Sequence, residues 1–477
     1  MVVQHNMQAA NANRMLNVTT SAQSKSTEKL SSGYRINRAA DDAAGLTISE
    51  KMRKQIRGLD QASTNAQDGV SSVQTAEGAL TEVHSMLQRM NELATQAANG
   101  TNSKDSDRQA IQDEIDQLTT EIDRVSETTK FNETYLLKGE AGTKTINMKA
   151  HDAGLKGTLT DNGDGTAKFV MDTLNAGDKV SIGGKTYTIG STADEVKTVV
   201  DDKIKQVSDT FTVNGQEIKI VADYTAAGKD VDQKEGKYKL DDLADAKALI
   251  KGGATVKIGT DEYKVMTDDK GGAADGVDDN DATVISKTKA YELASKELLA
   301  ANQIGDTKGN ATVKTADGKD DLNGTNGNGT FKITTGQAEV ANSLSFSLHV
   351  GADADMTNKI QVNIDAMDAA SLGIKGLNVK DASGNAATYA IDAIADAVSK
   401  VSAQRSALGA VQNRLEHTIA NVDNVVENTT TAESRIRDTD MAEEMVNYSK
   451  NNILAQAGQS MLAQANQSNQ GVLSLLQ

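Results

Sequence analysis

A long heptad pattern in the first quarter of the chain limits its fold more than any other feature. Apolar residues recur every seven positions in two series offset by three, so that eleven of twelve positions are apolar and the twelfth is glycine. The two series are Leu59, Ala66, Val73, Leu80, Leu87 and Ala94, and Ala62, Gly69, Ala76, Val83, Met90 and Ala97. Such spacing predicts one long helix with a coiled-coil-like seam, and the many alanines predict a closely packed partner helix.

Helical spacing also flanks this segment. Gln8 to Glu28 is compatible with a helix, Leu30–Asn37 reads as a break that contains Gly33, and a further break is expected at Asn99–Asp107. After it, apolar residues at 4-3-4-3 spacing predict another helix, and these residues are Ile111, Ile115, Leu118, Ile122 and Val125. The pattern therefore predicts several helices before any strand.

The far end of the chain carries a matching pattern. Its apolar residues at intervals of seven are Ile394, Val401, Leu408, Leu415 and Val422. Because each end supplies a long helix with an unpartnered seam, the simplest partner of each is the other. This arrangement brings the two ends together and makes the middle of the chain an insertion.

The middle, from about 140 to 340, is rich in Asp, Gly, Thr and Lys. Three segments alternate apolar and polar residues around a glycine-containing turn, and they read KVSIGGKTYTIG, FTVNGQEIKI and TVKIGTDEYKV. Asn214-Gly215 is a strong signal for a type I′ hairpin turn. Helices are expected near Ala193–Val207 and Ile285–Gln303. The fold class predicted is α+β and multidomain, with a discontinuous helical coiled-coil-like core and a β-hairpin-rich central insertion.

Both ends avoid charge. Asn451–Gln477 contains no charged residue, and Arg14 is the only full charge in Met1–Ser24. A flexible tail rich in Gln and Asn is one interpretation. The other is a helix surrounded by protein in an assembly, where ionic groups would be costly to bury. The occurrence at both ends favours assembly, and the residues expected to mediate polymerisation are Leu454, Met461, Ala465, Val472 and Leu475.

Composition excludes several classes of function. The net charge of −17 argues against a nucleic-acid partner. The sequence contains no run of 18 apolar residues, so no membrane-spanning helix is predicted. The chain has no Cys and no Pro, so it has no disulfide framework and no slow prolyl step on refolding. These absences suit a chain that is exported unfolded. Met1–Ser24 shows no secretory signal, so export is expected to use another route.

No catalytic, cofactor or metal site is predicted. The five histidines do not cluster, and no phosphate-binding loop or nucleophile elbow is present. The segment Asp161–Thr166 lacks the length and final Glu of a calcium loop, so it is interpreted as a polar turn. Asp41 and Asp42 follow two arginines, which favours an ion-pair or helix-start role over acid–base catalysis. The chain is therefore not predicted to be an enzyme.

The same helical segments resemble a known family. The matching runs include KLSSGYRINRAADDAAGLTISEKMR and IQDEIDQLTTEIDRVSETTKFN near the start, and AESRIRDTDMAEEM and QANQ near the end. They are similar to bacterial flagellin, the filament subunit of the flagellum. The resemblance covers roughly 1–150 and 340–477, whereas the middle of the chain resembles nothing that we can place.

This resemblance implies an architecture and a set of partners. Residues 1–40 and 440–477 would form the inner filament core, residues 41–145 and 340–439 the surrounding coiled-coil helices, and residues 146–339 a surface-exposed α+β insertion of one or two small domains. The implied partners are further copies of the chain, an export chaperone at about 440–477, and filament cap and hook-junction proteins. The implied location is extracellular, after export by the flagellar type III apparatus.

The resemblance also implies a receptor site for host Toll-like receptor 5. The matching positions are Arg89, Leu93 and Glu114. Arg89 and Leu93 are separated by four residues and so share one helix face, whereas Glu114 lies on the following helix. The residues alone favour a core-lining role for Leu93 and solvated charges at the other two positions, and it is the resemblance that points to a receptor site.

Three alternatives stay open at this stage. A hook–filament junction protein resembles flagellin at both ends, although the AESRIRDTDMAEEM and QANQ runs favour flagellin. A flagellin with a protease in its insertion would need a metal motif, and His151 is the only histidine between 140 and 340. A filament subunit whose insertion acts as an adhesin is the third alternative.

Overall fold

The computed structural model describes residues 6–99, 105–224, 228–268, 275–315, 329–381 and 384–475. The chain divides into two compact units. The first unit comprises Met1–Val73, Phe346–Val362 and Gly409–Gln477, and the second comprises Gln74–Ser345 and Asn363–Leu408. Helix α2 (Ala43–Ala98) and helix α9 (Asn385–Arg437) each contribute residues to both units. The three-part division of the chain stated above remains a prediction.

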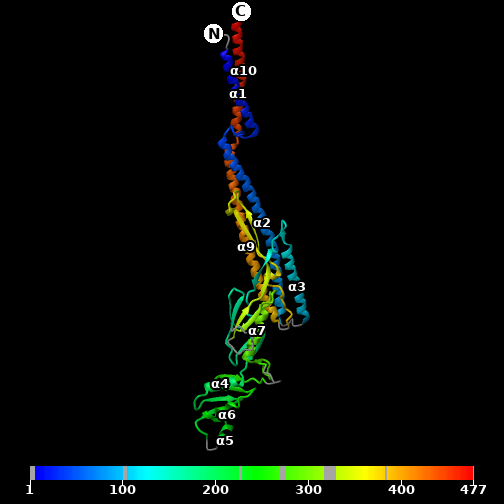
Figure 1. Cartoon of the computed structure of the whole chain (residues 1–477), viewed down its shortest axis with the longest axis vertical. Helices are drawn as coiled ribbons and strands as arrows, with labels where there is room; N and C mark the ends of the chain where they lie inside the picture. The colour runs from blue at the N-terminus through cyan, green and yellow to red at the C-terminus, as the bar shows by residue number, and fades with distance from the viewer. Residues whose placement is uncertain are drawn as a thin grey trace. The chain divides into compact units, whose positions relative to one another are not determined.

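The first unit pairs the two ends of the chain. Helix α1 (Met7–Ser32) lies beside helix α10 (Met441–Leu475), and the N- and C-terminal marks lie at the same end of this pair (Figure 1). Asn6 caps α1 by accepting a hydrogen bond from the Ala9 N–H at 3.0 Å. The helix ends at Gly33, whose φ of 76° closes the C-terminus. The expected break at Leu30 therefore begins three residues later than predicted.

A short junction connects the terminal helices to the long ones. Tyr34 forms an isolated antiparallel bridge with Asp438, and the Arg35 N–H donates to the Arg437 carbonyl at 2.7 Å. The Arg437 guanidinium lies over the Tyr34 ring at 5.0 Å and pairs with Glu50 at 2.7 Å. These contacts bring together residues that are some 400 positions apart and confirm that the two ends of the chain fold together.

A small apolar cluster holds α2 and α9 together in the first unit. Strands β17 (Leu344–His349) and β18 (Lys359–Ile364) form a two-stranded sheet against these helices. Ala66, Val350, Ile360 and Leu415 are buried in this cluster. A Cβ added at Gly69 would lie 2.2 Å from Leu348 Cδ1 and 3.3 Å from Leu415 Cδ1, so a larger residue would require the Leu348 side chain to move.

The burial of α2 along both units confirms the heptad prediction. Of the twelve seam positions in α2, all except Leu59 are buried. On α9, Ile394, Val401 and Leu408 are likewise buried. Helix α3 (Asp105–Thr128) begins inside the break expected at Asn99–Asp107 and buries Ile111, Ile115 and Ile122. Buried Arg108 donates to the Ala97 carbonyl at 3.2 Å and the Asp381 carbonyl at 2.6 Å, so it ties the end of α2 to the segment before α9.

The β-rich middle of the chain begins with a pairing of distant strands. Strands β1 (Lys130–Phe131) and β2 (Thr134–Tyr135) form a small antiparallel ribbon. Strand β3 (Glu140–Asn147) then pairs antiparallel with β16 (Gln337–Asn342), so the two borders of the insertion lie side by side. Helix α8 (Ala369–Leu372) contacts β16.

One hydrophobic core of the insertion lies between helix α7 (Lys287–Asn302) and two sheets. The four-stranded sheet has the order β14-β15-β5-β4, and its strands are β4 (Gly157–Asp161), β5 (Thr166–Met171), β14 (Thr312–Thr315) and β15 (Thr330–Thr334). The three-stranded sheet has the order β13-β7-β6, and its strands are β6 (Lys179–Ile182), β7 (Lys185–Ile189) and β13 (Val284–Ile285). Phe169, Phe331 and Tyr291 form an aromatic cluster in this core.

A second core belongs to a five-stranded sheet of order β10-β9-β8-β11-β12. Its strands are β8 (Thr210–Val213), β9 (Gln216–Val221), β10 (Lys237–Lys239), β11 (Thr255–Ile258) and β12 (Asp261–Lys264). The helices of this part are α4 (Ala193–Lys203), α5 (Lys229–Lys234) and α6 (Leu243–Lys247).

All three predicted hairpins are confirmed as the antiparallel pairs β6–β7, β8–β9 and β11–β12. Asn214 and Gly215 have φ values of 52° and 83°, as a type I′ turn requires. Helix α4 ends four residues before the predicted Val207, because Ile204 takes an extended conformation and is buried in the second core.

Candidate self-assembly surface

Few side chains of the α1–α10 pair are buried. Among its described residues only Ser26, Glu444 and Ala455 are buried, in contrast to the eleven buried seam positions of α2. Helices gain most of their stability in proteins by packing an apolar face. The pair therefore lacks, within one subunit, the core that its length would need.

Large apolar side chains instead point to solvent on both helices. Each is at least 47% exposed, and they are Met7, Met15, Val18, Met441, Met445, Val446, Ile453, Leu454 and Met461. Single exposed apolar side chains are normal on a protein surface, but a concentration of them on one pair of helices marks an interaction site.

A groove runs between the two helices. Its volume is about 740 Å³, and its lining includes Met15 and Leu16 from α1 and Leu454, Gly458 and Met461 from α10. Gly458 permits a close approach, since a Cβ at this position would lie 3.3 Å from Leu16 Cδ1. The groove walls are otherwise alanines, amides and hydroxyl groups, which can pack against similar groups without burying charge.

Apart from Arg14, which hydrogen-bonds to Asn11 on its own helix, the charges of the pair lie toward one end. Lys29 of α1 and Glu444 of α10 form an ion pair at 3.7 Å. Beyond Lys450 the sequence has no charged residue. Toward the other end, the Asn6 side-chain amide donates to the Ala465 carbonyl at 3.2 Å. The contacts between the helices thus change from ionic to amide along the pair, and the α10 side of the groove is formed by its uncharged portion.

The predicted polymerisation residues fall on this groove where they are described. Leu454 and Met461 are 47% and 62% exposed, and Ala465 also lines the groove. Val472 and Leu475 belong to α10, but their side chains lie outside the described residues. The heptad spacing missed Met445, Val446 and Ile453, which are exposed on other faces of α10. A search for any large apolar residue in the uncharged helices would have found Ile453.

The three residues predicted for receptor binding are placed in different environments. Arg89 donates through Nε to Glu114 at 2.9 Å and through Nη1 to Glu92 at 3.1 Å, and the hydrogen bond to Glu114 raises the pKa of Arg89. The side chains of Arg89 and Glu114 are 51% and 44% exposed, so both can contact a partner. Leu93 is only 2% exposed and packs inside the second unit.

The remaining polar candidates have local structural roles. Hydrogen bonds from the backbone N–H groups of Arg38 and Asn37 lower the pKa of Asp41, and Asp42 accepts from the Gly45 N–H at 2.8 Å near the start of α2. Asp161 and Asp164 accept hydrogen bonds within their own turn. Within the described ranges, no cluster of three or more His, Asp or Glu side chains could hold a metal ion. No described helix has both the length and the hydropathy to cross a membrane.

Comparison with known proteins gives consistent similarities at both ends and over the whole length. The model of the bacterial flagellin N-terminal helical region matches residues 3–142, and that of the C-terminal helical region matches residues 391–476. Flagellin of Clostridium tyrobutyricum is 38% identical over 98% of this chain and all of its own length. Flagellin of Bacillus subtilis is 34% identical over the full length of both chains, and flagellin D of Vibrio cholerae is 33% identical over 99% of each.

Proposed function

The chain belongs to the bacterial flagellin family, whose members are structural filament subunits rather than enzymes, and we propose that it polymerises through its α1–α10 pair into the flagellar filament that drives motility. The observation that carries this proposal is the uncharged, apolar and largely unburied surface of that pair. Further copies of the chain supply the missing core when they cover this surface.

The other expected partners follow from the same assignment. An export chaperone would cover α10 until assembly, because its exposed apolar residues would otherwise associate in the cell. Export through the flagellar type III apparatus, with cap and hook-junction proteins at the two ends of the filament, completes the proposed route to an extracellular location. The absence of Cys and Pro from the whole sequence suits an unfolded passage.

Purified subunit seeded with fragments of its own filaments is expected to grow long filaments. Turbidity would follow the growth and electron microscopy would show its product. An unseeded sample serves as the control for nonspecific aggregation. Subunit that stays monomeric, or that forms only closed rings, would contradict the filament assignment, and rings would favour a hook–filament junction protein.

We also propose that the exposed Arg89–Glu114 pair contacts host Toll-like receptor 5. The geometry supports a contact through these two charges, whereas Leu93 supports the helix from inside. Truncating an anchoring arginine at an interface commonly costs more than about 1 kcal/mol, which corresponds to roughly fivefold or more in affinity.

Arg89→Ala is therefore expected to weaken binding of the purified receptor ectodomain by about tenfold, measured by surface plasmon resonance. Arg124→Ala is the matched control, since Arg124 is also exposed and also pairs with a glutamate three residues away, Glu121. The control is expected to bind within about twofold of the unmodified chain. Equal losses in both variants would show that Arg89 has no special part in the contact.

A further inference from the structure

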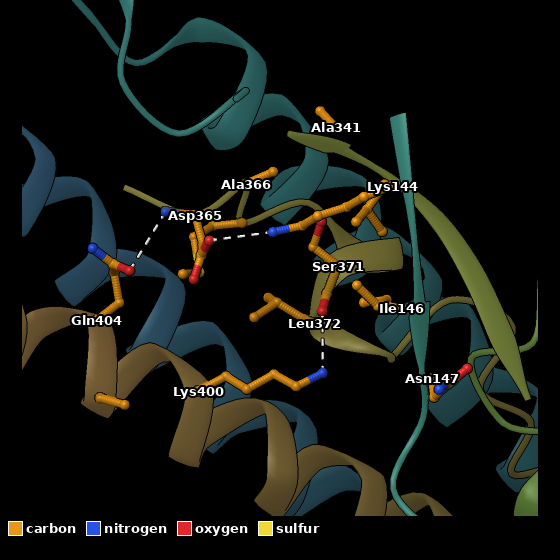
Figure 2. Close-up of a pocket in the computed structure, with 13 residues that line it drawn as sticks. Lys144, Ile146, Asn147, Ala341, Asp365, Ala366, Ser371, Leu372, Lys400 and Gln404 are labelled. Carbon is orange, nitrogen blue, oxygen red and sulfur yellow. Dashed lines mark hydrogen bonds and ion pairs between the residues drawn. The ribbon is translucent and has the colours of Figure 1, made fainter. Parts of the chain in front are cut away.

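A cavity of about 420 Å³ lies in the second unit among β3, β16, α8 and α9 (Figure 2). Its inner wall is part of the hydrophobic core, since Val340, Ala366, Met367 and Leu372 are all buried. Small-molecule sites in proteins are typically about 300–1,000 Å³ and mostly apolar, with a few placed polar groups. The cavity has the size and the lining of such a site.

Two lysines enter the cavity, and they differ in how they are paired. Lys144 extends from β3 toward Asp365, with 3.5 Å between Nζ and Oδ1, and also donates to the Ser343 hydroxyl at 3.0 Å (Figure 2). Lys400 extends from α9 and donates to the Ser371 carbonyl at 3.2 Å (Figure 2). Across the described part of the chain, no carboxylate lies within ion-pair distance of Lys400.

The ammonium of Lys400 is partly shielded by the protein, although the residue as a whole is exposed. The surrounding protein removes water from its ammonium and lowers the pKa of Lys400, while the negative charge of Asp396 acts in the opposite direction. Asp396 itself pairs with Lys149 at 2.9 Å. The lining of the cavity holds Lys144, Lys400 and Asp365, which together leave one net positive charge.

The other polar side chains of the lining already have hydrogen-bond partners, and Asn147 accepts from Gln337 Nε2 at 3.0 Å. The Gln404 side chain donates to the Asn363 carbonyl at 3.1 Å and accepts from the Asp365 N–H at 3.4 Å. The Ser371 hydroxyl bonds to Asp368. The ammonium of Lys400 has three N–H groups that can donate hydrogen bonds. The Ser371 carbonyl is the one acceptor that it contacts in the described part of the chain. Lys400 is thus the charged group of the lining that has no ion-pair partner among the described residues.

We propose that this cavity binds a small aliphatic carboxylate, with its carboxylate on Lys400 Nζ and its alkyl chain against Val340, Met367 and Leu372. A charge-assisted hydrogen bond to a partly desolvated ammonium is stronger than one between neutral groups. A neutral alcohol of the same length would leave the positive charge uncompensated, and an alkylammonium would be repelled. If Lys400 serves only to cap the C-terminus of α8 through the Ser371 carbonyl, no such selectivity follows.

Hexanoate titrated into the full chain, labelled with ¹³C at the methionine methyl groups, tests the proposal by NMR. Met367 lines the cavity, whereas Met15 and Met461 line the α1–α10 groove, so the spectrum separates the two surfaces. Met367→Leu would assign the reporter signal. A saturable shift of Met367 with hexanoate, at least about tenfold weaker with 1-hexanol or hexylammonium, is the expected result.

Lys400→Met keeps an unbranched apolar stem, removes the charge and is expected to weaken hexanoate binding by about tenfold or more. Lys400→Arg restores the charge and should recover part of the affinity. It therefore distinguishes the loss of the charge in Lys400→Met from a change in side-chain packing. Lys296→Met is the matched control, since Lys296 is an exposed lysine of α7 outside the cavity. No shift at Met367, shifts at Met15 and Met461 only, or equal binding by Lys400→Met would each overturn the proposal.

Discussion

Removal of Asn451–Gln477 is expected to abolish filament growth while leaving the rest of the subunit folded. The deleted residues carry the α10 side of the groove and the exposed side chains of Ile453, Leu454 and Met461. They contribute almost nothing to the core of the free subunit, because Ala455 is the only buried residue among those described in this segment. Seeded turbidity would measure growth, and circular dichroism on heating would measure folding.

A point variant distinguishes loss of the surface from loss of the helix. Ile453 is 67% exposed, so Ile453→Asp leaves the free subunit's unfolding transition nearly unchanged. In the polymer the new carboxylate would be buried without a partner at a cost of several kcal/mol, which lowers the association constant by on the order of a hundredfold or more. Normal filaments from either the truncated chain or Ile453→Asp would contradict the proposed role of the uncharged ends.

The matched control for this variant is Val207→Asp. Val207 is 51% exposed and lies in the insertion, outside the α1–α10 pair. The Val207→Asp variant introduces the same charge in place of a β-branched residue of similar exposure. This variant is expected to polymerise normally. A comparable loss of growth in this control would assign the effect to net charge rather than to position.

The helical part of the fold was predictable because its signal is local and periodic. The seam of α2 repeats one helix face over eleven buried positions, and Gly69 is the only glycine at a seam position. The three hairpins were predictable for a similar reason, since each consists of neighbouring strands around a glycine-containing turn. In both cases the decisive residues lie close together in the sequence.

The long-range strand pairings could not be predicted in this way. Strand β15 pairs with β5 so that Phe331 lies opposite Phe169, and β16 pairs with β3 so that Val340 lies opposite Lys144. Nothing local in either strand identifies a partner so distant in the sequence, because alternation specifies a buried face but not the strand beside it. The cavity with Lys400 depends on the second of these pairings and was therefore invisible in the sequence.

The candidate surface was predictable in location but only partly in its residues. Absence of charge identified both terminal helices, and heptad spacing identified Leu454 and Met461 on the groove. Ile453 was missed because heptad spacing selects one face, whereas a helix enclosed in an assembly has contacts all round. The sequence also did not determine whether Leu93 is buried. A residue four positions after an exposed arginine can face either a binding partner or the core.

Leu415→Ala is expected to destabilise the free subunit by about 2–5 kcal/mol, the range for truncating a buried leucine. Leu415 is fully buried in the cluster that joins α2, α9 and the β17–β18 hairpin, together with Ala66, Val350 and Ile360. Leu415 packs near Gly69 beside Leu348, and the rigid backbone of two long helices restricts collapse around the shortened side chain. Urea unfolding followed by circular dichroism would measure the change in unfolding free energy.

The control variant is Val425→Ala on the same helix. Val425 is 43% exposed, so its truncation removes little buried surface and gains helix propensity, and the expected change is within about 0.5 kcal/mol. The difference between the two variants isolates the cluster from general effects on α9. Equal unfolding free energies of the two variants would mean that the β17–β18 hairpin does not stabilise the packing of α2 against α9. The α2–α9 pair would then depend on its seam in the second unit alone.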